Sequence, residues 1–163
     1  MRKYWLAILL ISLLPLLVAA QETSGFRNHG YSFVAPGGLS GESEALLHFG
    51  VGGVGRIKGN FGLGAEAGYV YCTRCGINSG IGLFSINGSY HFATSRAPKV
   101  APFVTAGYSG AFRQGYANLL NFGAGVDYWF RPRMGLKAEF RDHLHTSGGA
   151  SHLWEARLAF IFR

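Results

Sequence analysis

A histidine, a serine and a glutamate near the end of the chain are residue types that hydrolytic chemistry uses. His145 and Ser147 are separated by one residue, and Glu155 follows in the same region. In such a set the imidazole removes the serine proton, the serine oxygen attacks an acyl carbon, and the carboxylate orients the imidazole. The alternative interpretation is a histidine-rich polar loop, because so short a pattern arises easily by chance.

Three histidines in this region form a second candidate site. His143, His145 and His152 surround one segment, and His143 and His145 would share a face if a strand extends that far. Two imidazoles at that spacing could hold a metal ion, but no carboxylate at a certain spacing completes the ligand set. We therefore expect solvated histidines, no metal and no cofactor.

Cys72 and Cys75 are the two cysteines of the chain and form a C-x-x-C motif. A redox-active pair needs a helix start that lowers the thiol pKa, and a structural zinc site needs four ligands. Neither context is visible around these residues. In an oxidising compartment the motif predicts a local disulfide, with two idle thiols as the alternative.

Seven charged residues alternate with apolar residues along the chain, which places them on one face of extended strands. Charged side chains that are removed from water persist only when they are paired. The pattern therefore predicts a structural ion-pair network rather than a catalytic or conducting site. Its members are Glu66, Asp127, Lys137, Glu139, Arg141, Glu155 and Arg157.

The elements that must position these residues are strands, because apolar residues recur at every second position. The clearest alternation covers residues 61–71, 120–130, 134–141 and 154–162. Weaker patterns complete a set of eight predicted strands, at residues 28–35, 45–56, 80–92 and 100–112. Proline cannot donate to a strand ladder, so a strand end or a bulge is expected at Pro102.

Glycine indicates which face of these strands points inward. All 25 glycines follow residue 20, and many lie opposite the apolar face. A water-facing surface of glycine would be poorly specified, whereas glycine inside a narrow barrel leaves room for large polar neighbours. Lipid also forbids open sheet edges. The predicted fold class is all-β: an eight-stranded antiparallel transmembrane β-barrel with a plugged interior.

Aromatic residues at the strand ends agree with this orientation, since two aromatic girdles are typical of the two membrane interfaces. One rim would hold Tyr90, Phe92, Tyr128, Phe130, Phe160 and Phe162, and the other Tyr71 and Trp154. The turns at the first rim carry basic residues without an acid, which could contact anionic lipid headgroups or be solvated. These residues are Arg56, Lys58, Arg96, Lys99, Arg131 and Arg133.

Residues 1–20 have the pattern of a secretory signal. Two basic residues precede an apolar run over 5–18, and small residues lead to a predicted cleavage after Ala20. A membrane anchor is the alternative, but the run is shorter than the roughly 20 residues of a spanning helix. The barrel domain would then cover residues 21–163. Because export separates the chain from nucleic acid, the net charge of +7 does not predict nucleic-acid binding.

On these residues the chain resembles the OmpA-like outer-membrane β-barrel family. The resemblance covers residues 21–163 and is carried by NFGAGVDYWFRPRMGLKAEFRD at 121–142 and by the closing strand LWEARLAFIFR. It implies an outer-membrane location, a monomer, contact with outer-membrane lipids, and recognition of the closing strand by the outer-membrane assembly machinery. Family members usually end on an aromatic residue, whereas Phe162 is followed here by Arg163.

The expected function is structural or surface-interacting, without catalysis. One alternative is enzymatic, because residues 139–150 resemble the histidine-x-serine region of outer-membrane lipid A deacylases. That resemblance implies a hydrolase that uses His145, Ser147 and Glu155, although Gly148 replaces the asparagine that normally follows the serine. A narrow passive pore is a further alternative, which the small lumen of an eight-stranded barrel disfavours.

Overall fold

The computed structural model describes residues 27–41, 45–73, 80–92, 99–113, 115–145 and 151–163. The predicted signal segment 1–20 and its cleavage after Ala20 lie outside these residues, as do Cys75 and Ser147. Among the described residues, no helix is long and apolar enough to cross a membrane.

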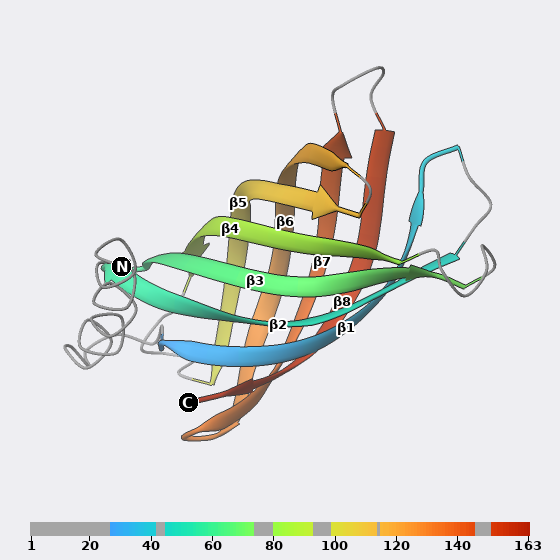
Figure 1. Ribbon diagram of the computed structural model, residues 1–163. Helices are drawn as coiled ribbons and strands as arrows, with labels where there is room; N and C mark the ends of the chain where they lie inside the picture. Colours follow the sequence, from blue (N-terminus) through green and yellow to red (C-terminus); the bar gives the residue numbers. More distant parts are fainter. Residues whose placement is uncertain (1–26, 42–44, 74–79, 93–98, 114, 146–150) are drawn as a thin grey trace, which may run out of the picture.

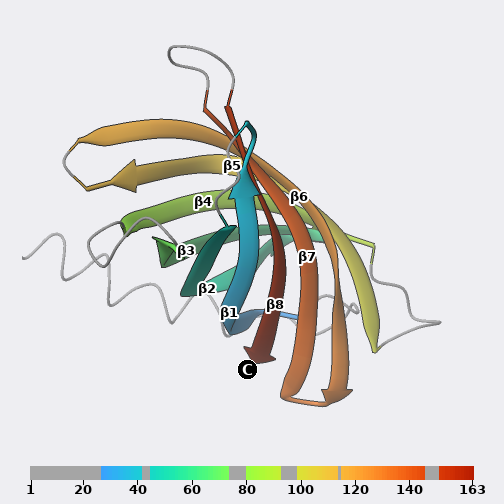
Figure 2. The same ribbon diagram turned by 90° about the vertical axis from the view of Figure 1, so that its right-hand side faces the viewer.

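The described residues form eight antiparallel strands that close into a single barrel (Figures 1 and 2). Each strand pairs with its neighbours in chain order, and β1 pairs with β8 to complete the ring. The predicted all-β barrel is therefore confirmed. The strands are β1 (His29–Leu39), β2 (Ala45–Lys58), β3 (Phe61–Cys72), β4 (Ile81–His91), β5 (Val100–Phe112), β6 (Tyr116–Arg131), β7 (Met134–His145) and β8 (Ser151–Phe162).

The barrel has a terminal end and a loop end. The terminal end is where β1 begins and β8 ends, and the loop end is the opposite one. Figure 1 shows the C-terminus beside the turn that joins β6 and β7, and the backbone N–H of Arg163 donates to the carbonyl of Arg133 in that turn (3.1 Å). The turn between β2 and β3 lies at the same end, because the strands alternate in direction.

Several strands extend beyond their predicted limits, because β6 begins at Tyr116 instead of residue 120, β7 ends at His145 instead of residue 141, and β8 begins at Ser151 instead of residue 154. β1 continues past Ala35 to Leu39, because Gly37 and Gly38 pair with both β2 and β8 instead of starting a turn. Pro102 is the third residue of β5 and pairs with Val126 without a register shift, so no bulge occurs there. Its carbonyl accepts from the N–H of Phe92 (2.7 Å), on a side where β4 has already ended, so the missing N–H of proline removes no bond between strands.

Side chains alternate between the lumen and the outer wall in every strand. The outer wall carries large apolar side chains, such as Leu158, Val51 and Phe61, which are 65%, 61% and 60% exposed. The buried positions hold many polar and charged side chains instead. This distribution is the reverse of that in a water-soluble protein and suits a barrel whose outer surface meets lipid.

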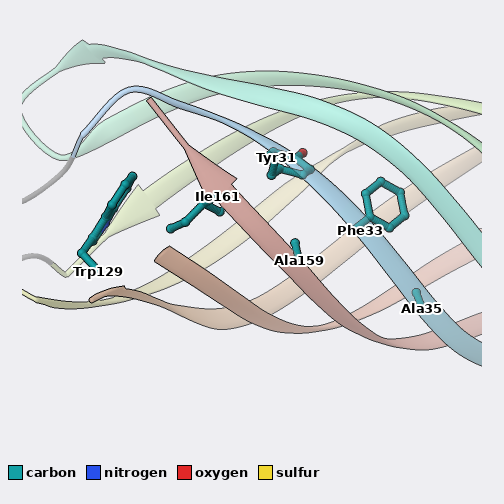
Figure 3. Close-up of a cluster of buried hydrophobic side chains, with 6 residues drawn as sticks. All are labelled: Tyr31, Phe33, Ala35, Trp129, Ala159 and Ile161. Carbon is teal, nitrogen blue, oxygen red and sulfur yellow. The ribbon is translucent and has the colours of Figure 1, made fainter. Parts of the chain in front are cut away.

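Apolar side chains form two clusters inside the barrel. The cluster toward the terminal end contains Tyr31, Phe33, Ala35, Trp129, Ala159 and Ile161 (Figure 3). The cluster at the loop end contains Val70, Leu83 and Leu119, with Leu46 and Ala111 packed against it. Polar and apolar side chains therefore lie beside one another in the lumen, since Tyr31 bonds to Glu66 and Phe33 packs against Arg157.

Candidate functional site: the polar lumen

Glu66 of β3 is the centre of an ion-pair cluster that spans the lumen. Arg157 donates from Nη2 to Oε1 of Glu66 (2.9 Å) and from Nη1 to Oε2 (3.1 Å). Arg141 donates from Nη1 to Oε1 (2.8 Å), and the Tyr31 hydroxyl donates to Oε2 (2.8 Å). Because β3 and β7 are four strands apart in a ring of eight, the bond from Arg141 to Glu66 joins opposite walls.

Glu139 supplies a second carboxylate to this cluster. Arg141 donates from Nε to Oε1 of Glu139 (2.7 Å), and Nη1 of Arg157 lies 3.6 Å from Oε2. The Arg157 guanidinium also stacks 3.9 Å from the ring centroid of Phe33. These charged side chains are at most 6% exposed, so each depends on its partners rather than on water to stabilise its charge.

Glu155 extends the cluster toward the loop end. Its Oε2 lies 2.8 Å from Nδ1 of His48, and its Oε1 lies 3.3 Å from Nε2 of His143 and 2.9 Å from Nε of Arg157. The Glu155 side chain is almost fully buried. Both carboxylate oxygens therefore have partners inside the barrel, and among the described contacts none joins Glu155 to His145.

A hydrogen-bond chain continues from Glu155 to the far wall. His143 contacts Ser109 (Nδ1 to Oγ, 3.1 Å), and Ser109 is also bonded to Asn121 (2.9 Å) and Ser85 (2.7 Å). Because Nε2 of His143 faces a carboxylate, a neutral ring carries its proton there and Nδ1 accepts from the Ser109 hydroxyl. Ser109, His143 and Glu155 thus have the order of a hydrolytic triad. Each of the three is at most 1% exposed.

The apolar cluster at the loop end covers this chain. Leu83, Ala111 and Leu119 each stand one inward position closer to the loop end than Ser85, Ser109 and Asn121. A substrate arriving from the loop end would have to displace that cluster. The arrangement therefore fills and orders the lumen and does not present Ser109 as an accessible nucleophile.

A second charge pair lies toward the terminal end. Nζ of Lys137 is 2.7 Å from Oδ1 of Asp127 and 3.7 Å from the ring centroid of Phe103. Nδ1 of His91 and Nε2 of His29 lie 3.6 Å and 3.8 Å from Oδ2 of Asp127. One buried carboxylate is therefore surrounded by a lysine and two imidazoles.

A small cavity separates the two charged groups. Its volume is about 20 Å³, and its walls include Tyr31, Asn87, Lys137, Glu139 and Arg141. That space holds about one water molecule. The charged side chains on the two sides of this cavity are paired within their own groups.

The seven residues of the predicted network all lie in the lumen, where the structure divides them into two groups. Glu66, Glu139, Arg141, Glu155 and Arg157 form the central cluster, and Asp127 and Lys137 form the terminal pair. His145 ends β7, where it pairs in register with Leu119 and Ser151. Ser147 lies outside the described residues, so its relation to His145 stays a prediction.

The candidate metal ligands are separated by the barrel wall. β7 extends to His145, so His143 is a strand residue that points into the lumen and not a loop residue. His152 lies on the outer wall, with Nδ1 2.7 Å from Oδ2 of Asp142. Within the described parts of the chain, no group of three His, Cys, Asp or Glu side chains is placed to hold a metal ion.

The predicted disulfide falls partly outside the described residues. Cys72 is the last residue of β3 and is buried. Cys75 belongs to the segment that is not described, so the pairing of Cys72 with Cys75 remains a prediction.

Several lumen residues were not identified from the sequence, although strand alternation contains the signal for them. His48 and Gly50 are two residues apart and both lie on the inward face of β2. Ser89 and His91 have the same spacing on the inward face of β4. Ser109 alternates inward after Thr105 and Gly107. Alternation places each of these residues in the lumen but does not reveal which residue it contacts.

Comparison with protein families and with curated proteins finds no match. Solved structures do match. The N-terminal β-barrel domain of Pseudomonas aeruginosa OprF has a TM-score of 0.61 at 17% identity, over 83% of this chain and 96% of that one. Neisserial surface protein A has a TM-score of 0.57 at 18% identity, over 87% and 99%.

The outer membrane enzyme PagL matches with a TM-score of 0.56 at 16% identity, over 79% of this chain and 97% of that one. At these identities the likeness concerns the fold, and the same fold carries both an enzyme and other barrels. The closed ring of strands and the apolar outer wall of this chain agree with that fold. The chain therefore has the fold of small eight-stranded β-barrels of the outer membrane, such as the OprF domain and neisserial surface protein A.

Proposed function

We propose that this protein has a structural or surface-interacting role in the outer membrane and that its lumen is closed to solutes. The observation that carries the proposal is the bonding of Glu66 to Arg141 and Arg157 across the lumen. An ion that passed through would have to separate these pairs in a place where water cannot replace them. Breaking a buried pair by removing one partner costs about 3–5 kcal/mol, which disfavours spontaneous opening.

The closed lumen can be tested by conductance in planar lipid bilayers. The wild-type barrel should shift on a gel after boiling, as folded outer-membrane barrels do, and should give no stepwise ion current. A matched variant removes the cluster by combining Glu66→Ala, Arg141→Ala and Arg157→Ala. If this variant still folds, it should conduct, and its current shows that the assay detects barrels inserted in the bilayer. A wild-type protein that shifts on boiling and conducts as well as the variant would refute the closed lumen.

The enzymatic alternative is a lipid A acyl hydrolase that uses Ser147 and His145. The sequence assigns the acid of this hydrolase to Glu155. The carboxylate oxygens of Glu155 are paired inside the barrel with His48, His143 and Arg157, which favours a non-catalytic role. Mass spectrometry of lipid A from a host that expresses the protein distinguishes the two functions. We expect no loss of an acyl chain. A loss with the wild type that disappears with Ser147→Ala would establish the enzyme.

The remaining partner proposals concern assembly. We propose that the protein is a monomer and that the assembly machinery recognises β8, whose outward residues Phe160 and Phe162 are exposed beside the terminal end. The variant Phe162→Ala should reduce the amount of heat-modifiable barrel in outer membranes, whereas Phe140→Ala on β7 should not. Equal amounts of both variants would contradict this role for β8, and a dimer in detergent would contradict the monomer.

A further inference from the structure

The terminal end of the barrel carries a ring of exposed basic side chains. We name Lys58, Lys99, Arg131 and Arg133 the basic rim, and all four are exposed. Lys58 ends β2, Lys99 directly precedes β5, and Arg131 and Arg133 flank the tip of the β6–β7 turn. The rim therefore comes from three successive connections and is distributed around the barrel and not gathered on one side.

No acidic side chain among the described residues faces this rim. Glu66, Asp127, Glu139 and Glu155 are buried in the lumen. Asp142, the other described acid, is near the loop end, where it contacts His152. The positive charge of the basic rim is thus not neutralised by any acidic side chain that the structure describes.

The connections at the loop end have a different charge pattern. Their sequence contains Glu42 and Glu44 as well as Arg74 and Arg113, so acids and bases balance there. The excess of positive charge is therefore specific to the terminal end.

Aromatic side chains on the outer wall place the basic rim at the height of lipid headgroups. Lys58 pairs in register with Phe61, and Phe61 packs against Tyr90 with ring centroids 4.8 Å apart. Phe130 directly precedes Arg131 and is exposed. Aromatic girdles mark the membrane interfaces, and long basic side chains just beyond them can extend to the phosphates.

We propose that the basic rim binds the headgroups of anionic phospholipids in the leaflet that surrounds the terminal end. The inference rests on the proposed function, because it requires a barrel embedded in a membrane. Guanidinium groups match phosphate oxygens with two parallel hydrogen bonds, and lysine supplies a point charge. A single protein partner would bind to one compact patch of basic residues. A ring of basic residues beside lipid-facing aromatic side chains can instead contact the lipids that surround the barrel.

Native mass spectrometry can measure this preference. The folded barrel would be exchanged into detergent with equimolar phosphatidylglycerol and phosphatidylcholine, and the ratio of bound lipids compared among variants. One variant combines Lys58→Gln, Lys99→Gln, Arg131→Gln and Arg133→Gln, and the control is Arg113→Gln near the loop end. A cation near an anionic surface contributes about a fivefold preference. We expect the combined variant to reduce the phosphatidylglycerol preference at least about tenfold, and the control to retain it.

The heat-induced gel shift reports whether the barrel is folded, independently of lipid binding. It therefore distinguishes loss of the lipid site from failure of the proposed function. A wild-type barrel that shifts on boiling but binds the two lipids equally would overturn the lipid site and leave the barrel intact. An undiminished preference in the combined variant would overturn it as well. Purified peptidoglycan is the probe for a different partner. If it bound to the wild type but not to the combined variant, and the wild type showed no preference for phosphatidylglycerol, the rim would be assigned to that partner.

Discussion

Glu66 on β3 and Arg157 on β8 are joined by two hydrogen bonds, from Nη2 to Oε1 at 2.9 Å and from Nη1 to Oε2 at 3.1 Å. This two-point contact fixes both side chains, and each is at most 3% exposed. Removal of one partner would leave the other charged and out of reach of water. Loss of a single charge in the lumen should therefore be more harmful than loss of a balanced pair.

The pair of Glu139 and Arg141 tests this relation. Arg141→Ala should lower the free energy of unfolding by about 3–5 kcal/mol, because Glu66 and Glu139 both lose a cation. Glu139→Ala should cost less, since Arg141 keeps its bond to Glu66. The double variant should be more stable than Arg141→Ala alone. Urea unfolding in phospholipid vesicles measures all three, and strictly additive losses would show that the charges do not act as a network.

Lys137 and Asp127 provide an independent test near the terminal end. Lys137→Met should destabilise the barrel by about 3 kcal/mol, because it leaves the buried Asp127 carboxylate with only two imidazoles as described polar neighbours. Addition of Asp127→Asn to the same chain should recover most of that loss. The urea midpoint is the readout. If the second substitution makes the protein still less stable, Lys137 acts through packing on Phe103 and not through its charge.

Gly52 tests whether glycine in the lumen makes room for the polar cluster. It pairs in register with Tyr31 on one side and Glu66 on the other, and a Cβ atom there would lie 2.6 Å from Cζ of Tyr31 and 2.8 Å from Cβ of Glu66. Gly52→Ala should therefore weaken the Tyr31–Glu66 bond and cost about 1–3 kcal/mol.

The matched control is Gly88→Ala on the outer wall, where the nearest atom to a new Cβ would be the carbonyl oxygen of Ala106 at 3.8 Å. That change should alter the free energy of unfolding by no more than about 0.5 kcal/mol. Equal losses in both variants would indicate that glycine matters for the strands themselves and not for the space that it leaves.

The barrel could be predicted because alternation is a local property. Glu66, Lys137 and Arg157 each stand between apolar neighbours, so their inward direction follows from their own strands. A closed sheet then follows from the requirement that lipid-exposed backbone groups be paired. The extension of β1 through Gly37 and Gly38 was missed, because the same residues are typical of turns and only their two partner strands keep them extended.

The contacts inside the lumen could not be predicted in the same way. Glu66 and Arg157 are 91 residues apart, and their meeting depends on the register of every strand pair between them. The same dependence explains why Glu155 was associated with His145 from the sequence, whereas the structure places it against His48 and His143. Strand alternation determines the face of a residue, and barrel geometry determines its partner.

Leu158 tests the orientation on which the whole assignment depends. It lies near the middle of β8, points outward, is 65% exposed, and is paired in register with Val34 and Ala138. If that surface meets the hydrocarbon core, Leu158→Arg should reduce the free energy of unfolding in vesicles by about 2–4 kcal/mol. Phe162 lies at the terminal end of the same strand, where a charged side chain meets the membrane interface. Phe162→Arg should therefore lower the free energy of unfolding by no more than about 1 kcal/mol through burial of the charge. Urea titration of both proteins, refolded into the same vesicles, gives the comparison. If Leu158→Arg were tolerated as well as Phe162→Arg, the exposed apolar surface would face something other than lipid.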